Sequence, residues 1–358
     1  MLLSISKVFI PAILAFLVGV FFTPVVTNFL YKKRLWKRIP RKDDAGMPKN
    51  EEMSLAFKQI NNVEEEIRTP RPGGIVVWGT VLLTVLVVFL LSQFFPNPIT
   101  SKLNFLSRGQ SLLPFFALIA GSLIGLVDDM CNIFVKEGNF RNGFPNKFVV
   151  LIVSLVGIIS GYWFFSKLGI TEIHIPFLGE WSLGILIIPL FLIVFLGTFS
   201  SGVIDGIDGL ASGVLISIFA ALGTIAYFQD QIDLATFCAT IVGALLVFLW
   251  FNIPPARFYL GETGMMGLVF TLPIIVFLTD TVLVFPIIAF PLVATALSSV
   301  IQIISKKIFG PIKGKVFRVA PLHHHFEAIG WSRAKITMRY WVISIICAVL
   351  GVVVVMIS

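Results

Sequence analysis

The 358-residue chain is poor in the residues that soluble proteins place on their surfaces. Only 13% of its residues are Asp, Glu, Lys or Arg, whereas 57% are hydrophobic. Charged residues make up about a quarter of an average soluble domain. A soluble domain of this length does not need so much apolar surface. The composition therefore excludes that class and indicates a protein that crosses a membrane several times.

Cysteine and the common nucleotide-binding motifs are also scarce or missing. Cys131, Cys238 and Cys347 are far apart and form no CxxC pair, which argues against a disulfide framework and a zinc site. The chain has no GxxxxGK[ST] sequence and therefore no P-loop. The first apolar run, 8–22, is not followed by a small-residue cleavage site, so we expect a retained membrane helix and not a signal peptide.

Ten apolar runs have roughly the length of a membrane-spanning helix, which takes about 20 residues. They are 5–29, 75–95, 112–127, 148–165, 183–196, 211–227, 235–251, 264–278, 282–304 and 340–357. The fifth run is short and is expected to borrow residues from both flanks. The sequence predicts an all-α polytopic membrane protein with about ten transmembrane helices, forming a single membrane domain over residues 1–358.

The distribution of Lys and Arg predicts how the chain is oriented. Of its 27 Lys and Arg residues, 23 lie in the connections that follow odd-numbered runs, most of them in 31–74 and 305–339. Excess Lys and Arg marks cytoplasmic loops. We therefore expect both long connections in the cytoplasm and both termini outside. The same bias accounts for the net charge of +8, so no nucleic-acid partner is expected.

The unusual polar residues of this chain follow the ends of runs on that cytoplasmic side. They are Asp128, Asp129, Asp205, Asp208, Asn252, Glu262 and His323 to His325. In SGVIDGIDGL, at 201–210, two aspartates stand three apart, a spacing that lets both face one ligand from a helix. A hydrated turn between two helices would explain that pair alone. Five carboxylates and three histidines on one side predict a single site.

Carboxylates beside histidines are typical of Mg²⁺-assisted chemistry on a diphosphate. Mg²⁺ binds one or two carboxylates together with waters and substrate phosphate oxygens. The adjacent Asp128 and Asp129 repel each other, which favours a neighbouring cation or a base role. Three consecutive histidines cannot all face one metal from a regular element. We prefer one or two of them binding an anionic group, with Lys313, Lys315 and Arg318 adding positive charge. A site at the membrane surface indicates a lipid substrate.

Several segments resemble the phospho-N-acetylmuramoyl-pentapeptide transferase family. APLHHHFEAIGW, at 320–331, is similar to its histidine motif, LVDDM to its Asp-Asp motif and DGIDGLA to its DGLDGLA. WFNIPPARFYLGETG is similar to FNxxPAxxFMGDxGS, and TPRPGG to TPTMGG. The resemblance runs from about residue 68 to the C-terminus. A wider superfamily of polyprenyl-phosphate hexosamine-1-phosphate transferases shares the aspartates, whereas HHHFE-x-x-GW points to the muramoyl branch.

The resemblance implies a reaction in peptidoglycan synthesis at the bacterial plasma membrane. Undecaprenyl phosphate attacks the β-phosphorus of UDP-N-acetylmuramoyl-pentapeptide, so that UMP leaves and lipid I forms. The active site would face the cytoplasm and require Mg²⁺, and the protein would be a homodimer in the lipid bilayer. Whether attack is direct or passes through a covalent aspartyl intermediate is left open.

The resemblance of these motifs also implies roles for individual residues of this chain. Catalytic roles fall to Asp128, Asp129, Asp205, Asp208 and His323, metal binding to Asp205 and Glu262, and substrate binding to Arg68, Asn252, Tyr259, His324 and His325. Among these, Asp128 matches the proposed base for the lipid phosphate. Asp205 and Asp208 match the loop that holds nucleotide and metal.

The chain departs from the family pattern at three places. Glu262 stands where the motif has Asp, residues 265–267 are Met-Met-Gly in place of Ser-Leu-Ala, and Phe199 and Gly202 replace two asparagines before the aspartate loop. Three interpretations follow: an active muramoyl transferase with an altered site, which we favour; a related transferase that uses another UDP-sugar; or a weakened or inactive member. An ion-coupled transporter, the rival from another class, predicts carboxylates near the bilayer midplane and paired repeats, and the sequence shows neither.

Overall fold

The computed structural model describes residues 2–36, 69–95, 97, 100, 103–106, 110–134, 143–310 and 313–358. Most of the long 31–74 connection, Arg68 included, lies outside these ranges. The elements in chain order are α1 (Leu2–Lys32), η1 (Pro72–Gly74), α4 (Ile75–Phe94), α6 (Leu112–Phe134), α7 (Asn146–Lys167), β1 (Glu172–Ile175), β2 (Gly179–Ser182), η2 (Gly184–Leu186), α8 (Ile187–Ser200), η3 (Ser201–Ile204), α9 (Leu210–Phe228), α10 (Ile232–Asn252), α11 (Gly261–Leu278), α12 (Phe285–Ile288), α13 (Phe290–Phe309), α14 (Leu322–Ala328) and α15 (Arg333–Ile357).

The described part of the chain contains ten helices that are long and apolar enough to cross a membrane, which confirms the number of predicted spans. The short fifth run is extended at its end as predicted, because α8 continues through Gly197 and Thr198 to Ser200. The predicted extension at its start is wrong, since Trp181 and Ser182 belong to β2. The ninth run is not one helix as predicted. It is divided at Ala289 into α12 and α13, and a proline stands in the first turn of each. Proline fits a first helical turn but interrupts a continuing helix.

One connection forms a strand pair that the sequence analysis did not predict. Strands β1 and β2 pair antiparallel, with His174 opposite Glu180. The turn between them contains Phe177, and β2 begins at Gly179; both residues have positive φ. The backbone N–H of His174 donates to both carboxylate oxygens of Asp280, each at 3.1 Å, so the hairpin is fastened to the turn after α11. Strands of four residues carry too little periodicity to predict from sequence.

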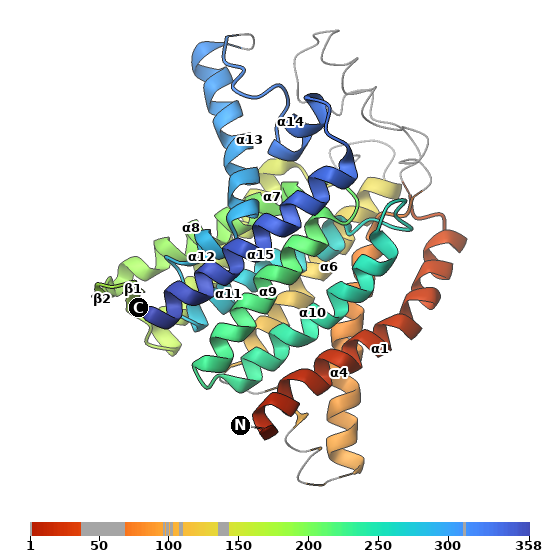
Figure 1. The fold of residues 1–358 in the computed structure, drawn as a ribbon, viewed down its shortest axis with the longest axis vertical. Coiled ribbons are helices and arrows are strands. Elements are labelled where there is room, and N and C mark those ends of the chain that lie inside the picture. Colours follow the sequence, from red (N-terminus) through yellow and green to blue (C-terminus); the bar gives the residue numbers. More distant parts are fainter. Residues whose placement is uncertain are drawn as a thin grey trace.

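The most buried helices are α9, α10 and α11, which form the centre of the bundle (Figure 1). Small residues let their neighbours approach closely, as is common between membrane helices. A Cβ added at Gly267 of α11 would lie 2.1 Å from the Ser122 hydroxyl of α6. At Gly213 of α9 it would lie 2.0 Å from the Trp341 indole nitrogen of α15. The outer helix α13 extends beyond its neighbours toward α14 (Figure 1).

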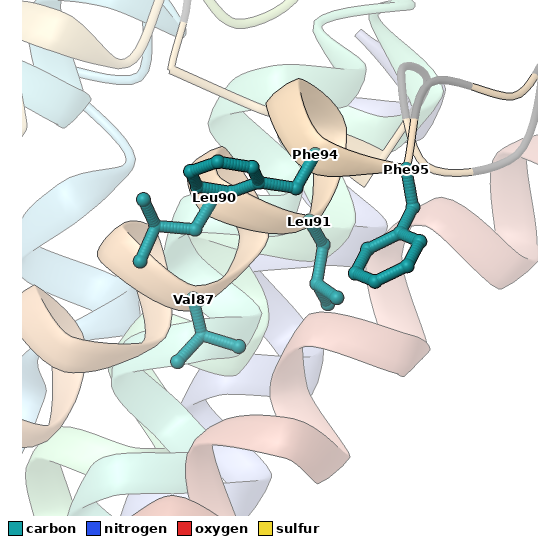
Figure 2. A pocket seen from close by; sticks show the side chains of 5 residues that line it. All are labelled: Val87, Leu90, Leu91, Phe94 and Phe95. Carbon is teal, nitrogen blue, oxygen red and sulfur yellow. The ribbon is translucent and has the colours of Figure 1, made fainter.

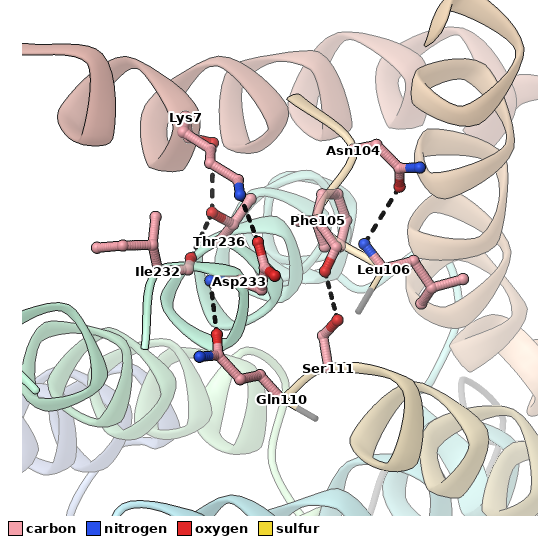
Figure 3. A network of polar contacts seen from close by, with 9 residues as sticks. All are labelled: Lys7, Asn104, Phe105, Leu106, Gln110, Ser111, Ile232, Asp233 and Thr236. Atoms are coloured by element: carbon pink, nitrogen blue, oxygen red, sulfur yellow. Dashed lines mark hydrogen bonds and ion pairs between the residues drawn. The ribbon is translucent and has the colours of Figure 1, made fainter. Parts of the chain in front are cut away.

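Both chain termini lie at one end of the bundle (Figure 1). A polar network there joins α1 to α10, through a 2.5 Å ion pair between Lys7 Nζ and Asp233 Oδ1 (Figure 3). The Gln110 side chain accepts from the Asp233 N–H at 3.1 Å, and Thr236 donates to the Lys7 carbonyl at 3.3 Å. The hairpin and the turn at Asp280 lie at this same end. Those predicted functional residues that the structure describes lie at the other end, which we call the site end.

A shallow pocket at the end of α4 is entirely apolar. It is lined by Val87, Leu90, Leu91, Phe94 and Phe95 (Figure 2). The lining offers no polar group to hold a substrate, and exposed apolar side chains are expected on a helix that faces lipid. We therefore do not place the active site there.

Candidate active site

Two carboxylates from other segments accept hydrogen bonds from the first turn of α11. The Gly261 N–H donates to Asp205 Oδ2 at 3.2 Å. Thr263 donates to Asp129 Oδ2 twice, through its N–H at 2.9 Å and its hydroxyl at 2.6 Å. The first N–H groups of a helix have no partner within the helix, and the helix dipole favours negative charge there. The start of α11 thus brings an aspartate of α6 beside one that follows η3.

Glycines allow this turn to pack directly on the backbone of two other segments. A Cβ at Gly125 of α6 would lie 2.0 Å from the Glu262 carbonyl oxygen. A Cβ at Gly74 of η1 would lie 2.2 Å from the Gly264 nitrogen. Gly261 itself has a φ of +63°, which glycine adopts without strain. The first turn of α11 is therefore held between α6 and η1.

Negative charge accumulates around this turn. Asp128 accepts from the Phe144 N–H and, at 3.3 Å, from the side-chain amide of Asn132. The exposed side chain of Glu262 interacts electrostatically with Asp129, Asp128 and Asp205, in that order of strength.

Asp205 is the member of this group that lies outside the membrane-spanning helices. Burial by its surroundings raises the pKa of Asp205 to about 7. The charges of Asp129 and Asp208 add to this rise in pKa, whereas the hydrogen bond from Gly261 and the positive charge of Arg71 oppose it.

The loop that carries the two aspartates of SGVIDGIDGL is fixed by the connection after α10. Asn252 accepts from the Gly209 N–H and donates to the Phe258 carbonyl, both at 2.8 Å. Asp208 Oδ2 accepts from the Ala256 N–H at 3.1 Å. Because both ends of the Asn252 amide bind backbone, the structure shows this residue positioning the loop. Its predicted contact with substrate stays a prediction.

The histidine motif of α14 packs on the same loop. A Cβ at Gly206 would lie 2.5 Å from His323 Nε2 and 3.1 Å from His324 Nε2. His323 is fully buried, and neither ring nitrogen has a hydrogen-bond partner within the described ranges. Burial, aided by the charge of His324, lowers the pKa of His323 well below its usual value, so its ring is neutral. His325 is engaged elsewhere, accepting from the Arg318 N–H at 3.1 Å.

Not all sequence-predicted residues meet at this loop. The structure brings together Asp128, Asp129, Asp205, Asp208, Glu262, His323 and His324. Tyr259 supports the site through its backbone, since its N–H donates to the Pro70 carbonyl and its own carbonyl accepts from the Gly73 N–H, each at 2.9 Å. Arg68 lies outside the described residues.

Sequence reasoning missed two residues at the site, Arg71 and Thr263. Arg71 interacts electrostatically with Asp129, Asp205 and Glu262. The signal for it was an arginine between two prolines directly before an apolar run, in the TPRPGG segment. Thr263 follows Glu262 directly in GETG. Nothing in that string distinguishes a residue that donates hydrogen bonds to a carboxylate from an ordinary turn residue.

The carboxylate oxygens at this site suit a hard divalent cation, although few protein side chains meet at any one position. Among the residues that the structure describes, no group of three or more His, Cys, Asp or Glu side chains is arranged to hold a metal ion. Mg²⁺ needs only one or two carboxylates, because waters and phosphate oxygens complete its octahedron. Five carboxylates gather here, and Arg71 interacts electrostatically with three of them, Asp129, Asp205 and Glu262. The site can therefore accept a cation together with an anionic substrate.

The chain was compared with known proteins. Residues 111–280, which include α6 to α11, match the model of the family "Glycosyl transferase family 4". A phospho-N-acetylmuramoyl-pentapeptide-transferase of Geobacillus thermodenitrificans is 33% identical over 289 residues, 79% of this chain and 83% of that protein. The protein of the same name from Bacillus mycoides is 32% identical over 341 residues, 94% of each chain. One from Clostridium perfringens is 29% identical over 344 residues, 95% of this chain and 94% of that protein. The chain therefore belongs to the phospho-N-acetylmuramoyl-pentapeptide transferase family of membrane phosphotransferases.

Proposed function

We propose that this protein transfers phospho-N-acetylmuramoyl-pentapeptide from UDP to undecaprenyl phosphate, producing lipid I and UMP. The observation that carries the proposal is the meeting of three motifs at one turn. Asp129 and Asp205 both accept hydrogen bonds from the start of α11, and His323 and His324 lie against Gly206 in the same loop. The family relationship supplies the substrate class, because relatives that match nearly the full chain carry this name.

The reaction exchanges one phosphorus–oxygen bond for another. An oxygen of the lipid phosphate forms a bond to the β-phosphorus, and the bond from that phosphorus to the bridging oxygen breaks, leaving that oxygen on UMP. Such transfers depend mainly on positioning and charge neutralisation. Asp128, held by the Phe144 N–H, is suited to orient the lipid phosphate and to accept its proton. His323 and His324 would contact anionic oxygens at the loop.

Asp205 and Glu262 are the residues that would hold Mg²⁺. When bound, the ion would neutralise charge on the diphosphate. The two other carboxylates supply negative charge to the site and also fix the protein itself: Asp129 fixes the start of α11 through Thr263, and Asp208 fixes the connection after α10 through Ala256.

The test is release of UMP by the purified protein supplied with undecaprenyl phosphate and Mg²⁺. UMP is expected from UDP-N-acetylmuramoyl-pentapeptide and not from UDP-N-acetylglucosamine. Release from the second donor alone would assign the protein to the related branch of transferases. Release from neither, by protein that elutes as a single folded species, would identify an inactive member.

We further propose that the site end faces the cytoplasm in the bacterial plasma membrane, because 23 of the 27 Lys and Arg residues belong to connections on that side. In a variant without native cysteines, Lys313→Cys at the site end should react with a membrane-impermeant thiol reagent only in inside-out vesicles. Glu172→Cys in the hairpin should react only in intact cells. Both residues are exposed. The opposite pattern would reverse the orientation and place the site away from cytoplasmic nucleotide.

A further inference from the structure

Glu327 is a buried carboxylate to which the proposed reaction gives no role. Its side chain is 4% exposed, and each of its oxygens has a partner. Arg333 Nε donates to Oε1 at 2.8 Å, and His324 Nδ1 lies 2.5 Å from Oε2. Burial alone would raise the pKa of Glu327, but the hydrogen bonds and charges of His324 and Arg333 lower it overall. Glu327 is therefore an ionised acceptor at neutral pH.

This arrangement determines what His324 presents to the loop. A carboxylate can only accept at Nδ1, so that nitrogen carries a proton, and a partner on one ring nitrogen fixes both ring orientation and tautomer. The other nitrogen, Nε2, then faces Gly206, 3.1 Å from where a Cβ would stand. Gly206 is exposed, so a ligand can reach this point.

A purely structural ion pair does not account for the geometry. Arg333 alone would neutralise Glu327, yet the second oxygen is directed to a histidine that faces the aspartate loop and not the solvent. His323, the next residue, is fully buried against the same glycine with neither ring nitrogen partnered among the described residues. Buried polar groups normally have a partner. His324, which is less buried, directs Nε2 at the same exposed glycine, and this points to a ligand oxygen bound on the loop side of His324.

We propose that Glu327 is a positioning residue, which holds His324 with Nε2 directed at the 205–209 loop to contact a phosphate oxygen of the nucleotide substrate. The proposal rests on the proposed function for the identity of that substrate. A protonated His324 would donate Nε2–H to the anionic oxygen, and charge-assisted bonds of this kind are about twice as strong as neutral ones. Glu327 holds that ring through Nδ1, and Arg333 keeps Glu327 in place.

The test is a double-mutant cycle on UMP binding, with Glu327→Gln, His324→Asn and the pair. Glu327→Gln should weaken UMP binding about tenfold, by analogy with the lower end of the losses of about 10–100-fold seen when the hydrogen-bond partners of metal-bound histidines are removed. In the His324→Asn background it should cause no further loss, because Glu327 acts through that ring. Binding of uridine, which has no phosphate, should not change. Glu172→Gln, an exposed glutamate in the hairpin, is the control for loss of one carboxylate.

The comparison of UMP with uridine gives a second readout, because a purely structural ion pair would affect the binding of both ligands. Equal losses of UMP binding in both backgrounds, or a matching loss of uridine binding, would show a structural ion pair and overturn the proposal. If Glu327→Gln lowers the yield of folded protein, Glu327→Asp replaces it in the double-mutant cycle. Aspartate keeps the negative charge, but its shorter side chain moves the carboxylate away from His324. An unmodified protein that binds no UMP would instead contradict the proposed function.

Discussion

Replacing Asp128 with Asn is expected to lower the rate of UMP release by about 10²–10⁴-fold, the usual contribution of a positioned base. The amide keeps an oxygen that can accept from the Phe144 N–H, so the change removes charge and basicity but little geometry. Asp129→Asn should cause a comparable loss, because an amide can still accept from Thr263 but leaves the site with one negative charge fewer. Asp205→Asn and Asp208→Asn are also expected to lower the rate of UMP release.

The rates are to be measured at equal amounts of protein that elutes as a single species from the membrane extract. Asp230→Asn is the matched control. Asp230 is exposed, lies in the turn after α9 at the end with the termini, and has a φ of +59° that asparagine tolerates. It should retain full activity. If Asp128→Asn also retained nearly full activity, Asp128 would not be the base, and the proposed attack would need another acceptor for its proton.

The spans could be counted from sequence because their signal is local. A run of about 20 apolar residues forms its own backbone hydrogen bonds whatever surrounds it. Because successive spans alternate in direction, the same count predicted that connections separated by two spans share one end of the bundle. That is why Asp129, Asp205 and His324 could be assigned to one region without any knowledge of how the helices pack.

The details of the site depend on contacts that no local pattern records. Asn252 uses both ends of its amide on backbone 43 and 6 residues away. His325 is directed away from the loop by Arg318, although its two neighbours in the triplet face it. The division of the ninth run at Ala289 reflects two prolines whose effect depends on where a helix begins. These outcomes follow from tertiary packing, which overrides local preference.

Glu262 is one of the positions at which the chain departs from its family. The structure excludes one way of accommodating the longer side chain. A glutamate carries its carboxylate about 1.5 Å further than an aspartate, the length of one carbon–carbon bond. One way to accommodate the longer side chain would be for the backbone to withdraw by this amount. The backbone has no room to do so, because a Cβ at Gly125 would already stand 2.0 Å from the Glu262 carbonyl and one at Gly74 2.2 Å from the Gly264 nitrogen. The additional methylene therefore places the carboxylate of Glu262 further outward, and the side chain is exposed.

Two other departures are in contact with each other near this turn. A Cβ at Gly202 would meet the Met265 side chain at 3.4 Å, an ordinary van der Waals distance. Met265 thus borders the position that a side chain at residue 202 would take, without filling it. Gly202 stands three residues before Asp205, and Met265 three residues after Glu262. Both proposed metal ligands therefore lie beside this altered pair, as expected if the site has been reshaped as a unit.

Glu262→Asp should consequently lower turnover, although it restores the residue of the family pattern. The fixed backbone would place the shorter carboxylate about 1.5 Å further in, and Mg²⁺ demands near-ideal octahedral geometry at 2.0–2.1 Å. Misplacement by about 1 Å can cost about 10²-fold in rate, and we expect a loss of that order at limiting Mg²⁺. The rise in Tm caused by Mg²⁺, which reports binding without turnover, should shrink in parallel. Glu172→Asp, the same change at an exposed hairpin position, should alter neither quantity. A gain in turnover or in Mg²⁺-induced stabilisation for Glu262→Asp would contradict a reshaped site, because it would mean that the glutamate weakens an otherwise unchanged metal geometry.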